Sequence, residues 1–293
     1  MTFDELLSKP ILADSGFDSY VKALYDEWLD SQKGGAFPTA DRLSTYIKGI
    51  RRDMPPQFFT GRLDSPVVLL SLNPHADGKG SAKEVLHEPF CTTWEDYLKY
   101  WQNFAHERYA DGGRVKARYG SKLPSSHFDD KLLLFFAAAA GVKADRRMLE
   151  KQHWLGLDFI PLNSPAFPPF KIDDYIRLYI SRIVDVLFLH ERKLVIVLNG
   201  MICKLLQKSS SADFTVSKPE KSAFKVKKTD GTDSARNCSV ERFRIQRKDG
   251  KGLNIVATTS FARQDLNGVP LENYGRQGFS DSEKQIIQEM LLK

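Results

Sequence analysis

Two asparagines in this sequence stand where a side-chain amide could take part in chemistry. Asn73 follows an apolar run at residues 67–72, Asn163 follows a second run at residues 159–162, and a proline comes within two residues of each. An amide offers a hydrogen-bond acceptor and two donors, so it can orient a water molecule or read the polar edge of a base, but it cannot act as a general base. The alternative interpretation is that each asparagine only forms a turn.

Strands are needed to hold these amides, and the apolar runs predict them. Residues 67–70 are four large aliphatic side chains without polar alternation, which is typical of a strand covered on both faces in a parallel sheet. Residues 155–162 and 193–199 predict two further strands, because turn-forming residues follow each run. Ligands of open α/β sheets bind at the carboxyl ends of strands, so we expect Asn73 and Asn163 to face one edge of the sheet.

Apolar residues at helical spacing predict the elements between these strands. We expect Thr92 or Thr93 to cap a helix that runs through Trp101, and Ser280 or Asp281 to cap the terminal helix. Other stretches with helical periodicity are residues 3–30, 43–50, 132–140 and 175–189.

Two stretches interrupt this pattern. Residues 106–127 are polar and basic, which indicates either an exposed insertion that tracks phosphates or a solvated loop. Residues 208–237 are rich in Ser, Lys and Asp and predict a long loop or a ragged hairpin. Further on, residues 240–245 alternate like an edge strand, and residues 253–258 form the last expected strand. The alternation of strands and helices predicts an α/β fold with parallel pairing.

The composition favours an intracellular protein with a polyanionic partner. The 293 residues carry a formal net charge of +6, and the 43 lysines and arginines recur in clusters, which favours nucleic acid. Cys91, Cys203 and Cys238 show no metal-ligand spacing, so we expect neither a disulfide framework nor a metal site. The start of the chain lacks the pattern of a signal peptide, and no apolar run reaches the roughly 18 residues of a membrane span. We therefore expect a soluble, cytoplasmic protein without membrane contact.

Taken together, the strand ends resemble the uracil-DNA glycosylase superfamily, and more closely its thymine/uracil mismatch-specific branch. The first motif of that branch, Gly-Ile-Asn-Pro-Gly, is approximated by Ser71-Leu72-Asn73-Pro74-His75, and its Ser-Ser-Ala-Arg ending by Ser260-Phe261-Ala262-Arg263. Asn163 falls near where such enzymes place a pyrimidine-reading asparagine, and residues 274–280 look like the family's entry to the last helix. Each motif is short, but their shared order at strand ends is hard to produce by chance.

The resemblance implies a fold and a domain organisation. It implies a three-layer α/β/α sandwich around a central, mostly parallel sheet of four to five strands, within residues 65–293. An N-terminal helical extension, residues 1–64, would pack on this core, and the stretches near 106–127 and 208–237 would be basic insertions.

The resemblance also implies a monofunctional DNA glycosylase. Such an enzyme flips a pyrimidine nucleotide out of DNA and hydrolyses its N-glycosidic bond, which leaves an abasic site. Uracil, mismatched thymine or a modified cytosine would be the base, in DNA repair or in defence against modified phage DNA. The enzyme would act on DNA as a monomer, without metal or cofactor.

Roles for individual residues follow from the same resemblance. Asn73 would orient the attacking water, and the base pocket would be formed by His75, Phe90 and Asn163. Arg263 would fill the space left by the flipped base, with Phe261 as a wedge. The other expected DNA contacts are Lys79, Arg276, Ser260 and Ala262, with further phosphate contacts from Arg114 and Lys116.

Several features keep other interpretations open. His75 replaces a small or tyrosyl residue of the family, Phe261 enlarges the insertion loop, and the family's His-Pro-Ser triplet is missing. The alternative function is therefore a catalytically inactive DNA-binding module that retains the glycosylase fold. Phe90 could equally be a core aromatic. A nucleotide-binding α/β enzyme is disfavoured because no GxGxxG or GxxxxGK[ST] loop follows the strands.

Overall fold

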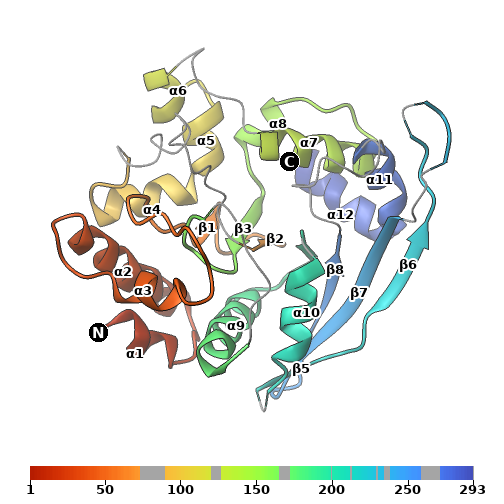
Figure 1. Ribbon diagram of the computed structural model, residues 1–293. Helices are drawn as coiled ribbons and strands as arrows, with labels where there is room; N and C mark the ends of the chain where they lie inside the picture. The colour runs from red at the N-terminus through yellow and green to blue at the C-terminus, as the bar shows by residue number, and fades with distance from the viewer. Residues whose placement is uncertain are drawn as a thin grey trace. The chain divides into compact units, whose positions relative to one another are not determined.

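The structure, a computed structural model, shows an α/β chain with a mixed sheet (Figure 1). It describes residues 1–72, 90–119, 127–164, 172–198, 200–211, 213–228, 230–233, 238–258 and 271–292. Two compact units are present, the first made of Met1–Asp64, Leu70–Phe104 and Leu155–Glu191, and the second of Ser65–Leu69, Ala105–Trp154 and Arg192–Lys293. The α/β class is confirmed. The described residues contain eight strands in parallel and antiparallel pairs, so a sheet of four to five mostly parallel strands is not confirmed.

Helices make up most of the first unit. Thr93 caps α4 as predicted, because its Oγ1 accepts a hydrogen bond of 3.1 Å from the amide of Asp96. The helical segment expected to follow Thr39-Ala40-Asp41 and run through Leu43 to Ile50 is confirmed only at its start, since α3 covers Pro38–Leu43 and Gly49 takes a positive φ of 72°. The helices of this unit are α1 (Phe3–Leu7), α2 (Asp14–Ser31), α3 (Pro38–Leu43), α4 (Trp94–Gln102) and α9 (Asp174–Leu187).

The strand expected over residues 155–162 ends earlier than the sequence pattern indicates. β1 (Phe59–Thr60) pairs antiparallel with β3 (Trp154–Asp158). On its other side β3 neighbours β2 (Val67–Ser71), and the amide of Phe159, just after β3, donates to the carbonyl of Ser71 at the end of β2. The strand expected over residues 155–162 therefore stops at Asp158. Pro161 has no N–H to donate and cannot extend the ladder.

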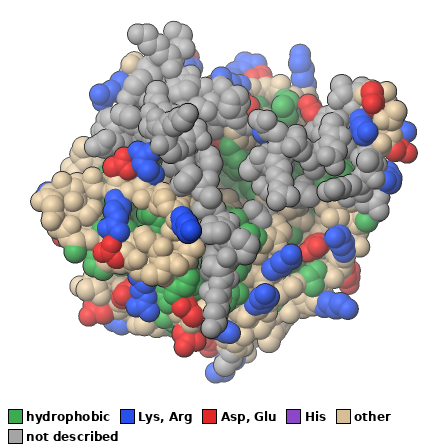
Figure 2. Space-filling model, in the orientation of Figure 1, with side chains coloured by type: hydrophobic (Ala, Val, Ile, Leu, Met, Phe, Trp, Pro, Cys, Tyr) green, Lys and Arg blue, Asp and Glu red, His purple; other side chains and the backbone are tan. Residues whose placement is uncertain are grey.

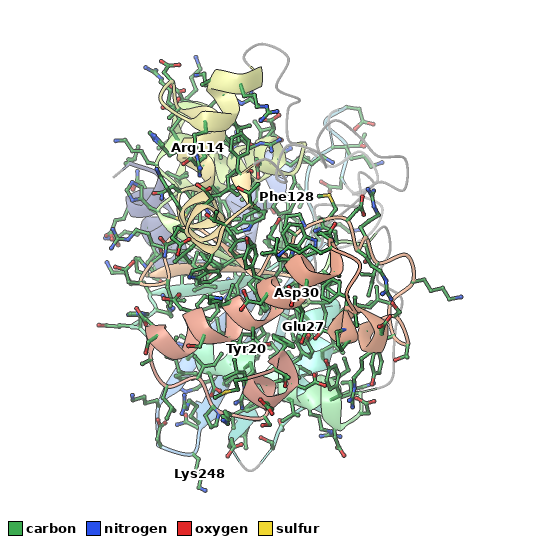
Figure 3. The ribbon with its side chains drawn as sticks, turned by 90° about the vertical axis from the view of Figure 1, so that its left-hand side faces the viewer. Tyr20, Glu27, Asp30, Arg114, Phe128 and Lys248 are labelled. Atoms are coloured by element: carbon green, nitrogen blue, oxygen red, sulfur yellow. The ribbon has the colours of Figure 1, made fainter. Side chains whose placement is uncertain are left out.

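Aromatic side chains form the core of the first unit. Phe3 and Tyr20 lie 4.8 Å apart between ring centroids, and Tyr20 in turn contacts Phe58 at 5.3 Å. Phe3 also contacts Tyr179 of α9 at 5.8 Å. Figure 3 shows Tyr20 on α2, together with Glu27 and Asp30 along the same helix. These contacts pack the N-terminal helices against the segment that enters β1 and against α9.

The second unit contains a mixed sheet. β4 (Leu194–Val197) pairs parallel with β8 (Gly252–Ala257), as predicted for two buried strands. β7 (Cys238–Arg247) pairs antiparallel with β8 on one side and with β5 (Phe214–Val216) and β6 (Glu220–Phe224) on the other. The expected edge strand at residues 240–245 is therefore an interior strand.

Three helices of the second unit, α7, α11 and α12, lie side by side (Figure 1). Phe135 of α7 contacts Tyr274 of α11 at 5.5 Å, and the backbones are close enough that a Cβ at Gly275 would overlap the Phe135 carbonyl oxygen. Ser280 caps α12 in a capping box: its Oγ accepts a hydrogen bond of 3.4 Å from the amide of Glu283, and Glu283 Oε2 accepts one of 2.7 Å from the amide of Ser280. The helices of this unit are α5 (Phe104–Tyr109), α6 (Arg114–Tyr119), α7 (His127–Ala140), α8 (Arg147–Glu150), α10 (Gly200–Lys208), α11 (Leu271–Gly278) and α12 (Asp281–Leu292).

The basic stretch at residues 106–127 is largely helical where the structure describes it. Glu107 is 4% exposed and pairs with Arg114 at 3.0 Å, and Lys116 pairs with Asp111 at 2.6 Å. The solvated loop is therefore wrong for residues 106–109 and 114–119, which are helical, and residues 120–126 of the stretch lie outside the described residues. Both predicted phosphate-binding side chains already have carboxylate partners, which lowers their value for binding phosphate.

Candidate functional site

A buried carboxyl group lies at the end of β3 in the first unit. The side chain of Asp158 is 5% exposed. Its Oδ1 accepts a hydrogen bond of 2.6 Å from Ser71 Oγ, and its Oδ2 accepts one of 2.7 Å from Gln57 Nε2. A buried carboxyl needs such donors, because an unpaired charge in the protein interior is very unfavourable.

Backbone hydrogen bonds hold the two donors in place. The amide of Phe159 donates to the Ser71 carbonyl at 2.9 Å, and the amide of Asp158 donates to the Phe58 carbonyl at 2.8 Å. Gln57 is held by its own amide, which donates to the Pro161 carbonyl at 2.7 Å. The carboxyl, the hydroxyl and the amide therefore come from three segments that are tied together through their main chains.

Burial raises the pKa of Asp158 to about 7, because desolvation outweighs the hydrogen bonds from Ser71 and Gln57, which favour the charged form. This carboxyl can therefore hold or release a proton near neutral pH. Since Gln57 Nε2 can only donate, Oδ2 stays an acceptor and the proton of the neutral form belongs on Oδ1. There it donates to Ser71 Oγ, which leaves the Ser71 hydroxyl hydrogen available to another acceptor.

Asn163 lies in the same unit, five residues after Asp158, and is 6% exposed. Its carbonyl accepts a hydrogen bond of 2.8 Å from the Arg51 amide, and its Nδ2 donates to the Pro55 carbonyl at 3.4 Å. The side-chain bond is at the long end of the accepted range. The bond from Arg51 fixes the main chain of Asn163, and the bond to Pro55 orients its side chain. The role of Asn163 in reading a base stays a prediction.

Phe90 is 7% exposed and stacks on Tyr100 of α4, with ring centroids 5.7 Å apart and planes 7° apart. The ring face toward Tyr100 is therefore covered. The next residue, Cys91, accepts a hydrogen bond of 3.2 Å at its carbonyl from the Tyr25 hydroxyl. Stacking of Phe90 on a flipped base stays a prediction that concerns its other face.

Arg276 lies in the second unit, exposed on α11. Its Nη1 donates to Asn273 Oδ1 at 3.2 Å. Arg276 also lines an open hollow of about 600 Å³ together with Lys284 and the C-terminal end of α7 around Gly141. The structure thus presents Arg276 to solvent, which a phosphate contact requires, and its contact with DNA stays a prediction.

The remaining predicted site residues lie outside the described residues. They are Asn73, His75, Lys79, Ser260, Phe261, Ala262 and Arg263. Of the first motif, the structure describes Ser71 and Leu72, whose carbonyls accept the amides of Phe159 and Ile160 at 2.9 and 2.8 Å.

Asp158 is the site residue that sequence reasoning missed. One signal could have found it, since it is the only carboxylate in the stretch from Leu155 to Leu162 that was expected to be a buried strand. Among the described residues, no three His, Cys, Asp or Glu side chains gather as metal ligands. In the same part of the chain, no helix has both the length and the apolar character to cross a membrane.

No protein-family model, curated protein or solved structure matches this chain.

Proposed function

We propose that this chain is a DNA glycosylase that flips out a pyrimidine nucleotide and hydrolyses its N-glycosidic bond. The observation that carries the proposal is the buried Asp158 carboxyl, bonded to Ser71 where β2 ends. Asn73 follows Ser71 by two residues, and two residues of chain span at most about 7 Å. The finer arrangement of the fold, three layers around a mostly parallel sheet, is part of this proposal.

The reaction needs two kinds of group: an amide that orients the attacking water, and side chains that bind the base. Asn73 aligns the water with the sugar carbon as the oxocarbenium-like transition state forms. Asn163 and His75 bind the polar edge of the pyrimidine, and Phe90 stacks on its ring. Because Asn73 is neutral, the rate is expected to lie below that of an enzyme with a carboxylate base at the same position.

Asp158 is a positioning residue in this scheme. Its hydrogen bond to Ser71 fixes the end of the strand from which Asn73 follows. When Asp158 is neutral, the Ser71 hydroxyl can donate elsewhere, so the protonation state of Asp158 changes what the strand end offers to a ligand. A pKa of about 7 puts that change near neutral pH.

DNA is the partner, and the chain acts alone. Lys79 and Arg276 bind phosphates, while Phe261 and Arg263 enter the duplex where the base has left. The net charge of +6 supports a polyanionic partner. Repair of deaminated bases and defence against modified phage DNA use the same chemistry, and the size of the pocket around His75 and Phe90 distinguishes them.

A catalytically inactive DNA-binding module is the second candidate function. Two observations favour it: Phe90 is packed against Tyr100, and the amide of Asn163 donates to Pro55 within the protein. If these side chains serve only the core, the fold keeps its basic surface without a base pocket.

The test uses labelled oligonucleotides, single- and double-stranded, that carry uracil, mismatched thymine or bulky modified cytosines. After incubation, heating in alkali cuts the strand wherever a base has been released. Scission by the wild-type protein and none by Asn73→Ala supports the glycosylase. Binding to every DNA without scission supports the inactive module, and neither binding nor scission contradicts both functions.

A further inference from the structure

Arg244 of β7 is an exposed arginine whose guanidinium is held in one orientation. Its Nε donates to Gln246 Oε1 at 3.2 Å, and its Nη1 donates to Asn254 Oδ1 of β8 at 3.1 Å. Gln246 is itself oriented, since its Nε2 donates to the Gly250 carbonyl at 2.6 Å. Both acceptors are neutral amides, so they fix the guanidinium without neutralising its charge.

Gly252 of β8 makes this orientation sterically possible. A Cβ at residue 252 would overlap Nη2, Cζ and Nε of Arg244, so the guanidinium lies directly over the backbone of the neighbouring strand. Any side chain at this position would displace it. The cross-strand register, with Arg244 opposite Asn254 and Gln246 opposite Gly252, brings the four residues together.

The charge of Arg244 is uncompensated within the described residues, where no carboxylate pairs with it. Arg242, two residues earlier, shows the contrast, because Glu283 accepts from its Nε at 2.9 Å and its Nη2 at 2.7 Å. Lys248 and Lys251, in the turn between β7 and β8, are also exposed and form no ion pair in the described part of the chain.

Basic side chains outnumber acidic ones around this turn, where the amide of Lys248 donates to the carbonyl of Asp213 at 2.9 Å. Lys248 extends away from the ribbon at the tip of the turn (Figure 3). Other Lys and Arg side chains gather over α10, β6 and β7 on the face drawn in Figure 2. The one acidic residue of the turn, Asp249, lies 3.6 Å from Arg247 and is therefore already paired.

We propose that Arg244, Lys248 and Lys251, together called the hairpin surface, bind phosphate groups of a DNA backbone. The guanidinium bonds its anion through Nη2 and loses little freedom on binding, because its amide partners already hold it. The choice of DNA as the polyanion rests on the proposed function and on the net charge of +6. The turn lies at the amino-terminal end of β8, at the other end of the strand from Ala257, so this contact is separate from any made beyond the carboxyl end of β8. A membrane is disfavoured, since the exposed large apolar side chains of the described residues lie on other elements, at Met1, Leu12, Phe128, Leu134 and Leu292.

The experiment measures the affinity of the full chain for a short undamaged DNA duplex by fluorescence anisotropy at several salt concentrations. Arg244→Gln should weaken binding about three- to tenfold at low salt and reduce the slope of log affinity against log salt by about 1. Gly252→Ala, which keeps the charge but displaces the guanidinium, should weaken binding as well. Arg147→Gln is the matched control, because Arg147 is exposed but paired with Asp145 at 2.6 Å.

The outcomes separate this inference from the glycosylase activity. Equal affinities for wild type, Arg244→Gln and Gly252→Ala would overturn it even if bases are released, and so would a wild-type protein that does not bind the duplex. An effect of Arg244→Gln without any base release would support the hairpin surface and contradict only the proposed function. If Arg244→Gln weakened binding to vesicles of anionic phospholipid but not to DNA, the ligand assignment would be wrong.

Discussion

The environment of Asp158 sets its protonation in two opposing ways. Ser71 and Gln57 each donate a hydrogen bond to the carboxyl, which favours the charged form, while burial favours the neutral form. Burial is the larger effect, because the two donors are neutral groups and cannot replace the solvation of a full charge. At neutral pH this residue therefore lies near its midpoint, and small changes around it shift the population of the two forms.

Asp158→Asn should change how stability depends on pH. A raised pKa means that the folded protein binds the proton more tightly than the unfolded chain. The contribution of Asp158 is therefore fully present below its ordinary pKa of 3.8 and is lost as the pH rises toward 7. Between about pH 5 and about pH 8 the free energy of unfolding of the wild type should fall by about 2–3 kcal/mol, whereas that of the variant should not show this fall. Urea unfolding at several pH values measures the difference.

Asn at this position mimics the neutral acid, since its Nδ2 can donate to Ser71 Oγ and its Oδ1 can accept from Gln57. The control is Asp64→Asn. The pKa of Asp64 is lowered by Arg62, so its titration is complete before the pH reaches this range. Parallel pH profiles for wild type and Asp158→Asn would show that the carboxyl does not titrate as proposed.

Asn73→Ala should abolish base release while leaving DNA affinity within a few-fold of wild type. A water-orienting amide acts mainly in the transition state, so its loss lowers the rate, by about a hundredfold or more, rather than the binding. Single-turnover base release and duplex binding are measured on the same preparation. A similar fall in both would mark Asn73 as a residue that holds the loop and not the water.

At the scale of the elements, backbone contacts bring the side chains into register. The amides of Phe159 and Ile160 reach the carbonyls of Ser71 and Leu72, so the end of β2 cannot shift without breaking the pairing that places Asp158. In the second unit, the approach of α11 to α7 depends in the same way on a residue without a side chain, Gly275.

Gly275→Ala should destabilise the second unit. The new methyl group meets the Phe135 carbonyl, and such overpacking costs about 1–3 kcal/mol, more than the roughly 1 kcal/mol that alanine gains over glycine in a helix. Thermal or urea unfolding measures the change in the free energy of unfolding. Gly200→Ala is the matched control, because a Cβ at this helical glycine meets nothing within 4 Å. If both variants were equally stable, the close contact of α11 with α7 would be wrong.

At the scale of the whole molecule, the net charge bears on the encounter with DNA, the partner that we propose. A net charge of +6 draws the chain to any polyanion, and this attraction weakens as salt rises. Not every basic side chain contributes, since Arg114 and Lys116 are paired with carboxylates whereas Arg244 is not. We expect pairing within the fold, in addition to the count of lysines and arginines, to influence which charges reach a phosphate.

Arg263→Ala should impair action on duplex DNA far more than action on single strands. A base flipped out of a duplex loses pairing and stacking worth a few kcal/mol, which a plug in the vacated space offsets, whereas a single-stranded base leaves no hole. The duplex rate should fall about tenfold or more, and the single-strand rate should stay nearly unchanged. Single-turnover base release from matched substrates at one salt concentration measures both. A proportional fall on both substrates would make Arg263 a general phosphate contact.

Local features of this chain could be predicted from the sequence. The caps at Thr93 and Ser280 and the buried strands β2 and β4 lie where the pattern placed them. Each depends on side chains within a few residues, because a cap satisfies amides of its own first turn and an unbroken aliphatic run suits a strand covered on both faces. The α/β class follows from the same local signals.

Only the tertiary structure decided which polar group ends β3, which strand is interior and which charges are free. Asp158 lies at the end of β3, and the residues that hold it there, Phe58 and Ser71, are far away in the sequence. β7 is interior because β5 and β6, in a stretch without periodicity, pair with it. The pKa of Asp158 depends on burial, which is a property of the folded chain. Neighbours in the sequence determine an element, whereas its partners and its dielectric surroundings come from residues that only folding brings close.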